Sequence, residues 1–331
     1  MEKAFANFTV LFFGNRDMIN NNIQSSNGKY LFGPVPSRRF GRSLGIDMVP
    51  FKTCSFNCLF CEVGKTNCHT LQRAEYVPVA DVINEFDNWL ESGGYADVVT
   101  VAGSGEPTLH LHFGDVIDAV RDHSNIKTVL LTNSSLLHIE DVRNQAARAD
   151  IAKVSLSAWN QESFQKVNKP HKSLLFSDVV AGIKDFREIY KEEMRLEVVV
   201  LPGINSQPDD MAKIAEIAKS FAPDSIELNT VVRPPAFSSV SQASATQLLS
   251  LAPLFTPVAH VIAGFDKSKM SAISVGSDEL VAMLARRPCT EKDIAQTFSI
   301  SKLQVNKLIR DLCESGLIKP KVQNNEIYYV T

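Results

Sequence analysis

The sequence predicts an α/β protein: a partial (β/α)6 TIM-like barrel followed by a small C-terminal winged helix-turn-helix domain. The first observation is an alternation of short β-branched runs with amphipathic stretches between residues 43 and 263, which is typical of strand–helix units around a parallel sheet. The second is a change of pattern after residue 264, where three short helical stretches precede a hairpin. A closed barrel needs eight strand–helix units, so the six found here predict a barrel that is open on one side.

The strands are expected where Val, Ile and Leu dominate short runs, namely at 43–49, 97–102, 127–132, 151–157, 195–201 and 225–230. Helices are expected between and after them, where apolar residues recur at helical spacing: 79–91, 113–122, 140–147, 177–190, 208–221 and 246–252. The carboxyl ends of parallel barrel strands share one rim, and chemistry sits on the loops there. Polar residues that follow the strands should therefore meet at one mouth.

The chain is expected to divide into an N-terminal extension at 1–28, the barrel at 29–264, a linker at 265–277 and the winged-helix domain at 278–331. The linker is rich in Ser, Lys and Gly. The last domain has eight Lys or Arg against seven Asp or Glu, a weak charge for a nucleic-acid reader, and winged helices also dock proteins. RNA and protein therefore both remain as partners. Its helices are expected at 278–286, 291–298 and 302–314, with a hairpin around Asn324-Asn325.

Composition narrows the class of protein. The net charge of -3 excludes a surface that binds nucleic acid or membrane phosphates all over. No apolar run reaches membrane-spanning length, so no membrane partner is expected. Only six cysteines occur in 331 residues, and their spacing is not that of a disulfide framework. We therefore expect a cytoplasmic protein.

Cys54, Cys58 and Cys61 form a cluster directly after the first predicted strand. Thiolates are the usual protein ligands of iron-sulfur clusters, and three of them leave one iron of a four-iron cluster open. Cys68 and His69 follow closely and could instead complete a tetrahedral zinc site. The cysteine spacing alone leaves both interpretations open.

The loop after the second predicted strand adds a second motif, Gly103-Ser104-Gly105-Glu106-Pro107. Together with Phe60, the aromatic residue before Cys61, it makes residues 33–264 resemble the radical S-adenosylmethionine (SAM) superfamily. The resemblance implies that Cys54, Cys58 and Cys61 hold a [4Fe-4S] cluster and that SAM binds its open iron. It also implies reductive cleavage of SAM to a 5'-deoxyadenosyl radical that abstracts a hydrogen atom. A flavodoxin- or ferredoxin-like reductant is the implied partner, and zinc would need neither the glycines nor the acid.

Further cofactor contacts are expected on the same rim, because polar residues end several of the strands there. The loop resembles the superfamily's Gly-Gly-Glu-Pro element but carries Ser104 at its second position, and Ser155 matches a serine that meets the cofactor in relatives. Many relatives carry Asp where this chain has Ser157. The expected cofactor-binding residues are Gly105, Glu106, Asn133, Ser155, Ser157 and Asn229.

Three segments resemble a subgroup similar to wyosine-base-synthase-like Fe-S oxidoreductases, which favours RNA or tRNA modification. They begin at Arg38, Asn168 and Leu228. Arginines can pair with phosphate or carboxylate groups, but they can equally form an ion-paired surface. A peptide- or protein-modifying radical SAM enzyme is the alternative, and an Fe-S redox-sensing winged-helix regulator is the alternative of another class. The substrate candidates are Arg38, Arg39, Arg42, Asn168, His171 and Arg233.

Overall fold

The computed structural model describes residues 29–37, 39–262, 277–286, 288–298, 300–323 and 326–331. The extension at 1–28, Arg38, most of the expected linker and the Asn324-Asn325 turn lie outside these described residues.

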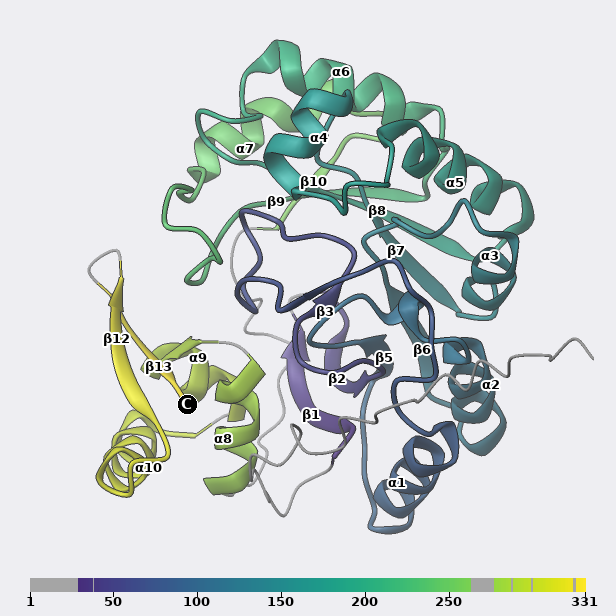
Figure 1. The fold of residues 1–331 in the computed structure, drawn as a ribbon. Coiled ribbons are helices and arrows are strands. Elements are labelled where there is room, and N and C mark those ends of the chain that lie inside the picture. Colours follow the sequence, from purple (N-terminus) through teal and green to yellow (C-terminus); the bar gives the residue numbers. More distant parts are fainter. Residues whose placement is uncertain (1–28, 38, 263–276, 287, 299, 324–325) are drawn as a thin grey trace, which may run out of the picture.

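One sheet of eight strands forms the centre of the molecule (Figure 1). Seven strands run parallel, and the first is antiparallel to its neighbour. Among the described residues the order is β1-β2-β5-β6-β7-β8-β9-β10, so this sheet has two edges and does not close. The bounds are β1 Leu31–Ser37, β2 Gly41–Asp47, β5 Val98–Ala102, β6 Lys127–Leu131, β7 Ile151–Ser155, β8 Glu193–Val199, β9 Ser225–Asn229 and β10 His260–Val261.

The six expected strands correspond to β2 and β5 to β9, whereas the two edge strands were not predicted. β1 contains Gly33, Pro34 and Pro36, which argue against a strand in the sequence. Proline is tolerated there because β1 is an edge strand whose outer side needs no ladder donors. β10 has only two residues and gives no periodic signal.

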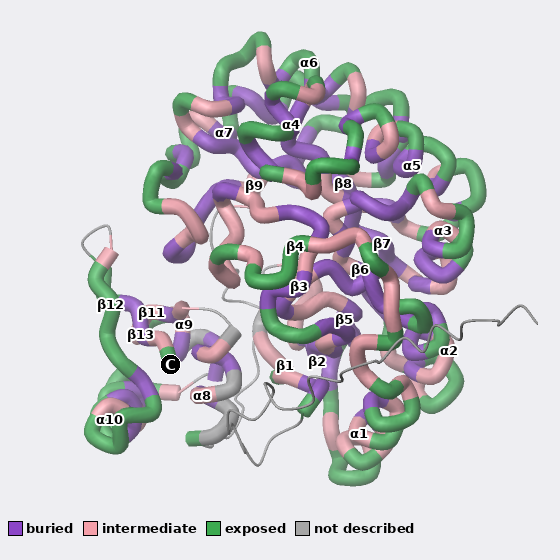
Figure 2. The backbone as a smooth tube through the Cα atoms, viewed as in Figure 1, coloured by how far each residue is buried: buried purple, intermediate pink, exposed green. Residues whose placement is uncertain are grey.

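Helices cover the outer face of the sheet, and each buries one apolar side against it (Figures 1 and 2). In the first helix, for example, Val82 and Phe86 are buried. All six expected helices are present, together with a helix at Gln161–Asn168 that was not predicted. The bounds are α1 Val79–Glu91, α2 Phe113–His123, α3 Glu140–Ala146, α4 Gln161–Asn168, α5 Phe176–Ile189, α6 Pro208–Lys219 and α7 Ala245–Leu251, with short 3-10 turns at Pro107–Leu109 and Ala252–Leu254.

The C-terminal elements form a separate small core that includes Leu280, Ile294 and Val305. Val35 of β1 packs against this core, so the C-terminal elements lie beside the first strand of the barrel (Figure 1). A capping box between Ser301 and Gln304 starts the last helix. The elements are α8 Ser277–Arg286, β11 Cys289–Thr290, α9 Glu291–Phe298, α10 Lys302–Glu314, β12 Lys319–Gln323 and β13 Glu326–Val330, with sheet order β11-β13-β12.

A short parallel pair, β3 Thr53–Cys54 with β4 Cys68–His69, follows β2 at the carboxyl end of the barrel. It brackets the cysteine loop, which we define as residues 52–69. In the part of the chain that the structure describes, no helix combines the length and apolar character needed to cross a membrane.

Candidate functional site

The cysteine loop is fixed by main-chain bonds to the end of α4. Asn57 N donates to Asn168 O at 3.1 Å, and Leu59 N donates to Val167 O at 3.0 Å. Its other side rests on the loop after β5, because Glu106 N donates to Thr53 O at 3.1 Å. The carboxyl ends of neighbouring barrel segments thus hold the three cysteines at the mouth predicted from the sequence.

The sulfurs of Cys54, Cys58 and Cys61 each have their own side-chain N–H donor. Asn133 Nδ2 lies 3.6 Å from Cys54 Sγ, and Asn168 Nδ2 lies 3.5 Å from Cys58 Sγ. The third donor is charged, since Lys52 Nζ lies 3.1 Å from Cys61 Sγ. Donors to a sulfur favour its thiolate form. The three donors come from three different segments, and Lys52 was not predicted from the sequence.

Burial of the Cys54 and Cys58 thiols opposes a negative charge on their sulfurs, and the positive charge of Lys52 counteracts this effect. Burial, together with the nearby Glu106 carboxylate, raises the pKa of Cys54 to about 12, and burial raises that of Cys58 well above its usual value. The Lys52 charge lowers both pKa values. Lys52 is only 3% exposed, and among the described residues no carboxylate lies within 4 Å of its Nζ. A buried ammonium without a counter-charge is costly, so thiolates on an iron-sulfur cluster fit this site.

The zinc alternative is not supported by the geometry. Cys68 and His69 are exposed, and His69 Nε2 lies 3.0 Å from the Ser55 carbonyl oxygen. Within the described ranges, no three His, Cys, Asp or Glu side chains converge on a position for a single metal ion, and this holds for the three clustered cysteines as well as for Cys68 and His69. A closed zinc site would require such a convergence.

Glu106 is buried and its carboxylate is already fully engaged. Oε1 accepts bonds from Thr108 N at 3.2 Å, Thr108 Oγ1 at 2.6 Å and Thr132 Oγ1 at 2.7 Å, while Oε2 accepts one from Asn133 N at 2.8 Å. Burial raises the pKa of Glu106, and these donors oppose the rise. The carboxylate therefore positions Asn133, which contacts Cys54. A direct cofactor contact by Glu106 stays a prediction.

The glycines before Glu106 pack against protein atoms. A Cβ on Gly105 would lie 1.9 Å from Thr53 O, and one on Gly103 would lie 2.0 Å from Asp47 Oδ1. Ser104 Oγ donates to Asp47 Oδ2 at 2.6 Å. Glycine lets another group approach the backbone closely, and Gly105 is one of the expected cofactor-binding residues. The structure shows that Gly105 admits the backbone of the cysteine loop.

Ser157, Ser155 and Asn229 are the remaining predicted cofactor residues, and of these Asn229 lines a pocket. Ser157 is buried and its hydroxyl accepts a bond from Val199 N at 2.9 Å, so it ties neighbouring chain segments together. Ser155 is partly exposed, and its amide donates to Ser134 Oγ at 3.0 Å. Asn229 lines the pocket described next, and its Oδ1 is buried with no hydrogen-bond partner among the described atoms. Asn229 thus offers an acceptor to a ligand.

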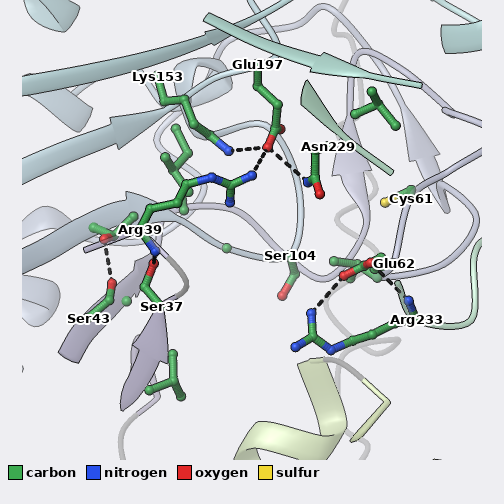
Figure 3. Close-up of a pocket in the computed structure, with 18 of the residues that line it drawn as sticks. Ser37, Arg39, Ser43, Cys61, Glu62, Ser104, Lys153, Glu197, Asn229 and Arg233 are labelled. Atoms are coloured by element: carbon green, nitrogen blue, oxygen red, sulfur yellow. Dashed lines mark hydrogen bonds and ion pairs between the residues drawn. The ribbon is translucent and has the colours of Figure 1, made fainter. Parts of the chain in front are cut away.

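A pocket of about 440 Å³ opens on the inner face of the barrel beside the cysteine loop. Cys61 and Ser104 line one part of it, and Arg39, Lys153 and Glu197 line another (Figure 3). A volume of this size is typical of small-molecule sites. The pocket therefore connects the cysteine loop to a group of charged side chains.

These charged side chains form a buried ion network. Arg39 pairs with both Glu197 and Glu227, and Lys153 Nζ lies 2.8 Å from Glu197 Oε1. Although burial raises it, the charges of Lys153 and Arg39 lower the pKa of Glu197 to about 2. Asn229 Nδ2 donates to the same carboxylate at 3.2 Å. Lys153 and Glu197 were not predicted, although charged residues inside apolar strands were the signal that could have found them.

Two of the substrate candidates line the pocket. Arg39 belongs to the ion network, and Arg233 is 7% exposed, with Nη1 3.0 Å from Glu62 Oε2. Arg233 Nε is buried without a hydrogen-bond partner among the described atoms.

The other candidates lie elsewhere. Arg42 is expected at the substrate. The structure places it at the start of β2, at the opposite end of this strand from the cysteine loop. There it stacks on the Tyr95 ring at 4.0 Å and pairs with Asp97. Asn168 contacts Cys58, as described above. His171 N donates to Ser55 O at 2.9 Å, and its ring packs on His69.

A model of the radical SAM superfamily matches residues 48–216, a range that holds the cysteine loop, Glu106 and the parallel strands β5 to β8. The chain belongs to the radical SAM superfamily. This radical SAM protein is therefore an enzyme that uses a [4Fe-4S] cluster and SAM, as the resemblance implied.

Two relatives match most of this chain. A UPF0026 protein of Helicobacter pylori (strain ATCC 700392 / 26695) is 33% identical over 276 residues, covering 82% of this chain and 88% of the relative. A Brachyspira hyodysenteriae protein named GTPase Obg is 31% identical over 305 residues, which are 91% of this chain but 45% of that protein.

A solved structure supports the fold alone. A structure of TYW1 with a lysine-pyruvate adduct bound has a TM-score of 0.51 at 17% identity, covering 66% of this chain and 74% of that chain. The predicted α/β fold with a parallel sheet is confirmed.

Proposed function

We propose that Cys54, Cys58 and Cys61 ligate the [4Fe-4S] cluster and that the adjoining pocket receives SAM and the reacting part of the substrate. The proposal is supported by the three sulfurs, each with an N–H donor, at one end of a pocket of about 440 Å³. When bound, the cluster supplies the electron for reductive cleavage of SAM, which yields the radical that abstracts hydrogen from the substrate.

The side chains of the pocket have separate tasks in this proposal. Apolar groups such as Phe32, Val35 and Phe60 line part of the pocket and exclude water from the reacting atoms. Asn229 Oδ1 and Arg233 Nε present a buried acceptor and a buried donor. A ligand that pairs with both removes the cost of leaving them unsatisfied, which fixes its orientation.

The substrate that we propose is RNA, and one observation carries this choice. Phe237 lies on the segment that follows Arg233, and Lys65 Nζ and Lys169 Nζ sit 4.9 Å and 5.3 Å from its ring centroid. We call these three residues the rim patch. Its aromatic residue lies against the cysteine loop, because Phe237 N donates to Leu59 O at 3.3 Å.

The rim patch combines basic side chains with an aromatic ring, which are the two kinds of group that bind single-stranded nucleic acid. Lys65 and Lys169 are exposed and can contact phosphates, while an aromatic ring can stack on a base. A base held there would lie next to the pocket that contains Cys61. A probable dual-specificity RNA methyltransferase RlmN of Streptococcus mutans is 23% identical over 177 residues, which agrees with an RNA substrate.

We propose that the C-terminal elements are a winged-helix domain that helps to hold the RNA. The support is the order of three helices and a β12–β13 hairpin, with Lys302 exposed at the start of α10. Tyr328 Oη donates to Val232 O at 3.4 Å, so this domain meets the segment that leads to the rim patch. A flavodoxin- or ferredoxin-like reductant and a cytoplasmic location complete the proposal, since both suit a cluster that must accept electrons in a reducing compartment.

The test is crosslinking of the reconstituted protein to RNA, followed by sequencing of the bound RNA. The variants Phe237→Ala and Lys65→Ala should each reduce crosslinking several-fold. Lys184→Ala, an exposed lysine on the outer helix α5, is the matched control and should leave it unchanged.

Two outcomes would contradict the RNA assignment. One is equal crosslinking by all three variants. The other is capture of peptide in place of RNA, which would favour the peptide-modifying alternative. The redox-sensing regulator is disfavoured already, because the superfamily is one of enzymes.

A further inference from the structure

Lys52 has an unusual setting for a lysine. It is 3% exposed, and its φ of +59° lies in the left-handed region that side chains other than glycine seldom adopt. Its main chain is held on both sides, because its N donates to Ser104 O at 2.9 Å and its O accepts from Asn67 N at 3.0 Å. These bonds keep an unfavourable conformation that aims the side chain at Cys61.

The three donors to the cysteine sulfurs are not equivalent. Asn133 and Asn168 are neutral amides at 3.6 Å and 3.5 Å, whereas the ammonium of Lys52 is 3.1 Å from its sulfur. The closest donor thus carries the positive charge. Hydrogen bonds and charges near the sulfurs are known determinants of the potential of iron-sulfur clusters.

We infer that Lys52 is a positioning residue that raises the reduction potential of the cluster held by Cys54, Cys58 and Cys61. The inference rests on the proposed ligation. Reduction adds one electron from a one-electron protein donor to the cluster, and no bond to Lys52 forms or breaks. The reduced cluster carries one more negative charge than the oxidised cluster, so a fixed buried cation stabilises it more.

The position of Lys52 makes a clean substitution available. Lys52→Met keeps the length and apolar stem of the side chain but removes both the charge and the N–H donor. Lysine and methionine both have a Cβ, so the left-handed backbone at residue 52 is equally strained in the wild type and in the variant. Lys52→Gln keeps an N–H donor without the charge, and Lys52→Arg keeps both.

The experiment is a redox titration of the anaerobically reconstituted full chain, monitored by the EPR signal of the reduced cluster. Lys52→Met should lower the equilibrium constant for one-electron reduction at least tenfold, which is about 59 mV. Lys52→Arg should stay near the wild type, and Lys52→Gln should fall between them. Asn168→Ala removes a neutral donor and should shift the potential less than Lys52→Met.

Iron and sulfide contents distinguish a failure of the proposed cluster ligation from a failure of the proposed role of Lys52. A wild-type chain without a four-iron cluster overturns the proposed function itself. A wild-type cluster with equal potentials in Lys52→Met and the wild type overturns the role of Lys52. If Lys52→Met holds no cluster, the comparison of Lys52→Gln with Lys52→Arg decides, and equal potentials in those two variants overturn the inference.

Discussion

Replacing Glu106 by glutamine separates two roles of this residue, positioning of Asn133 and direct contact with SAM. Oε1 receives three donors and Oε2 receives one. Glutamine replaces one carboxylate oxygen by an NH2 group, which cannot accept a hydrogen bond. The loss of stability is smallest if the NH2 group takes the Oε2 position, where only the bond from Asn133 N is lost. The lost bond is charge-assisted, and such a bond contributes about 1.5–3 kcal/mol. We therefore expect Glu106→Gln to lower the free energy of unfolding by about that amount.

The lost bond is also the one that anchors Asn133, whose amide contacts Cys54. A second consequence is therefore a lower iron content after reconstitution. Urea unfolding monitored by circular dichroism measures the first effect, and the iron-to-protein ratio measures the second. Glu216→Gln, which changes an exposed acid on α6, should stay within about 0.5 kcal/mol of the wild type.

A Glu106 carboxylate that acts only by contacting the cofactor, with no contribution from its four hydrogen bonds to stability, predicts the opposite combination. Stability and iron content would then match the wild type, while SAM binding measured by calorimetry would weaken. That result would refute the positioning role that we derive from the four bonds.

Three further predictions concern other parts of the site. The pKa of Glu197 falls from 4.5 to about 2 on folding. The ionised carboxylate therefore stabilises the folded state fully above pH 4.5, and this stabilisation is lost as the pH drops toward 2. Its contribution to the free energy of unfolding is roughly 3 kcal/mol. The stability gap between wild type and Glu197→Gln should shrink between pH 5 and pH 3 in acid titrations of unfolding, and a constant gap would contradict this. Gly105→Ala should cost about 1–3 kcal/mol in urea unfolding and reduce iron loading, because its Cβ would meet Thr53 O; wild-type stability would show that the contact is relieved freely. Arg42→Met should change stability by less than about 1 kcal/mol and leave RNA crosslinking intact, and loss of crosslinking would return Arg42 to the substrate side.

The parallel strands were predictable because each is buried and therefore reads as a short apolar run. The edge strand β1 was not, since Pro34 and Pro36 are acceptable only where a neighbour is missing, and the sequence does not state which strand lies at the edge. The same limit applies to α4. Its polar exposed side leaves mainly Phe164 and Val167 as apolar signals, which are too few to define a helix.

The position of Cys54, Cys58 and Cys61 at the mouth of the barrel was predictable from the sequence, but the N–H donors around their sulfurs were not. Cofactor and substrate contacts by Asn133 and Asn168 stay predictions, and the structure places the side-chain amides of both residues against cysteine sulfurs. Their chemistry as N–H donors was visible in the sequence, whereas the partner depends on how the loops fold together. Lys52 stands two residues before the first cysteine, where it adopts a left-handed conformation and its side chain contacts Cys61, and neither feature is visible in the sequence.

Glu62 connects the cysteine loop to the C-terminal elements. Its Oε1 accepts bonds from Val232 N at 3.1 Å and Arg233 N at 3.2 Å, and its Oε2 pairs with the Arg233 guanidinium. Tyr328 of β13 donates to the carbonyl of Val232, so one short chain of bonds runs from the last strand to the residue after Cys61. Arg233 is buried, and if its guanidinium moved away from Glu62, the Glu62 carboxylate would lose its ion pair beside the pocket. A displacement of the C-terminal elements would therefore be transmitted through Val232 to Glu62, the residue that follows Cys61 in the cysteine loop.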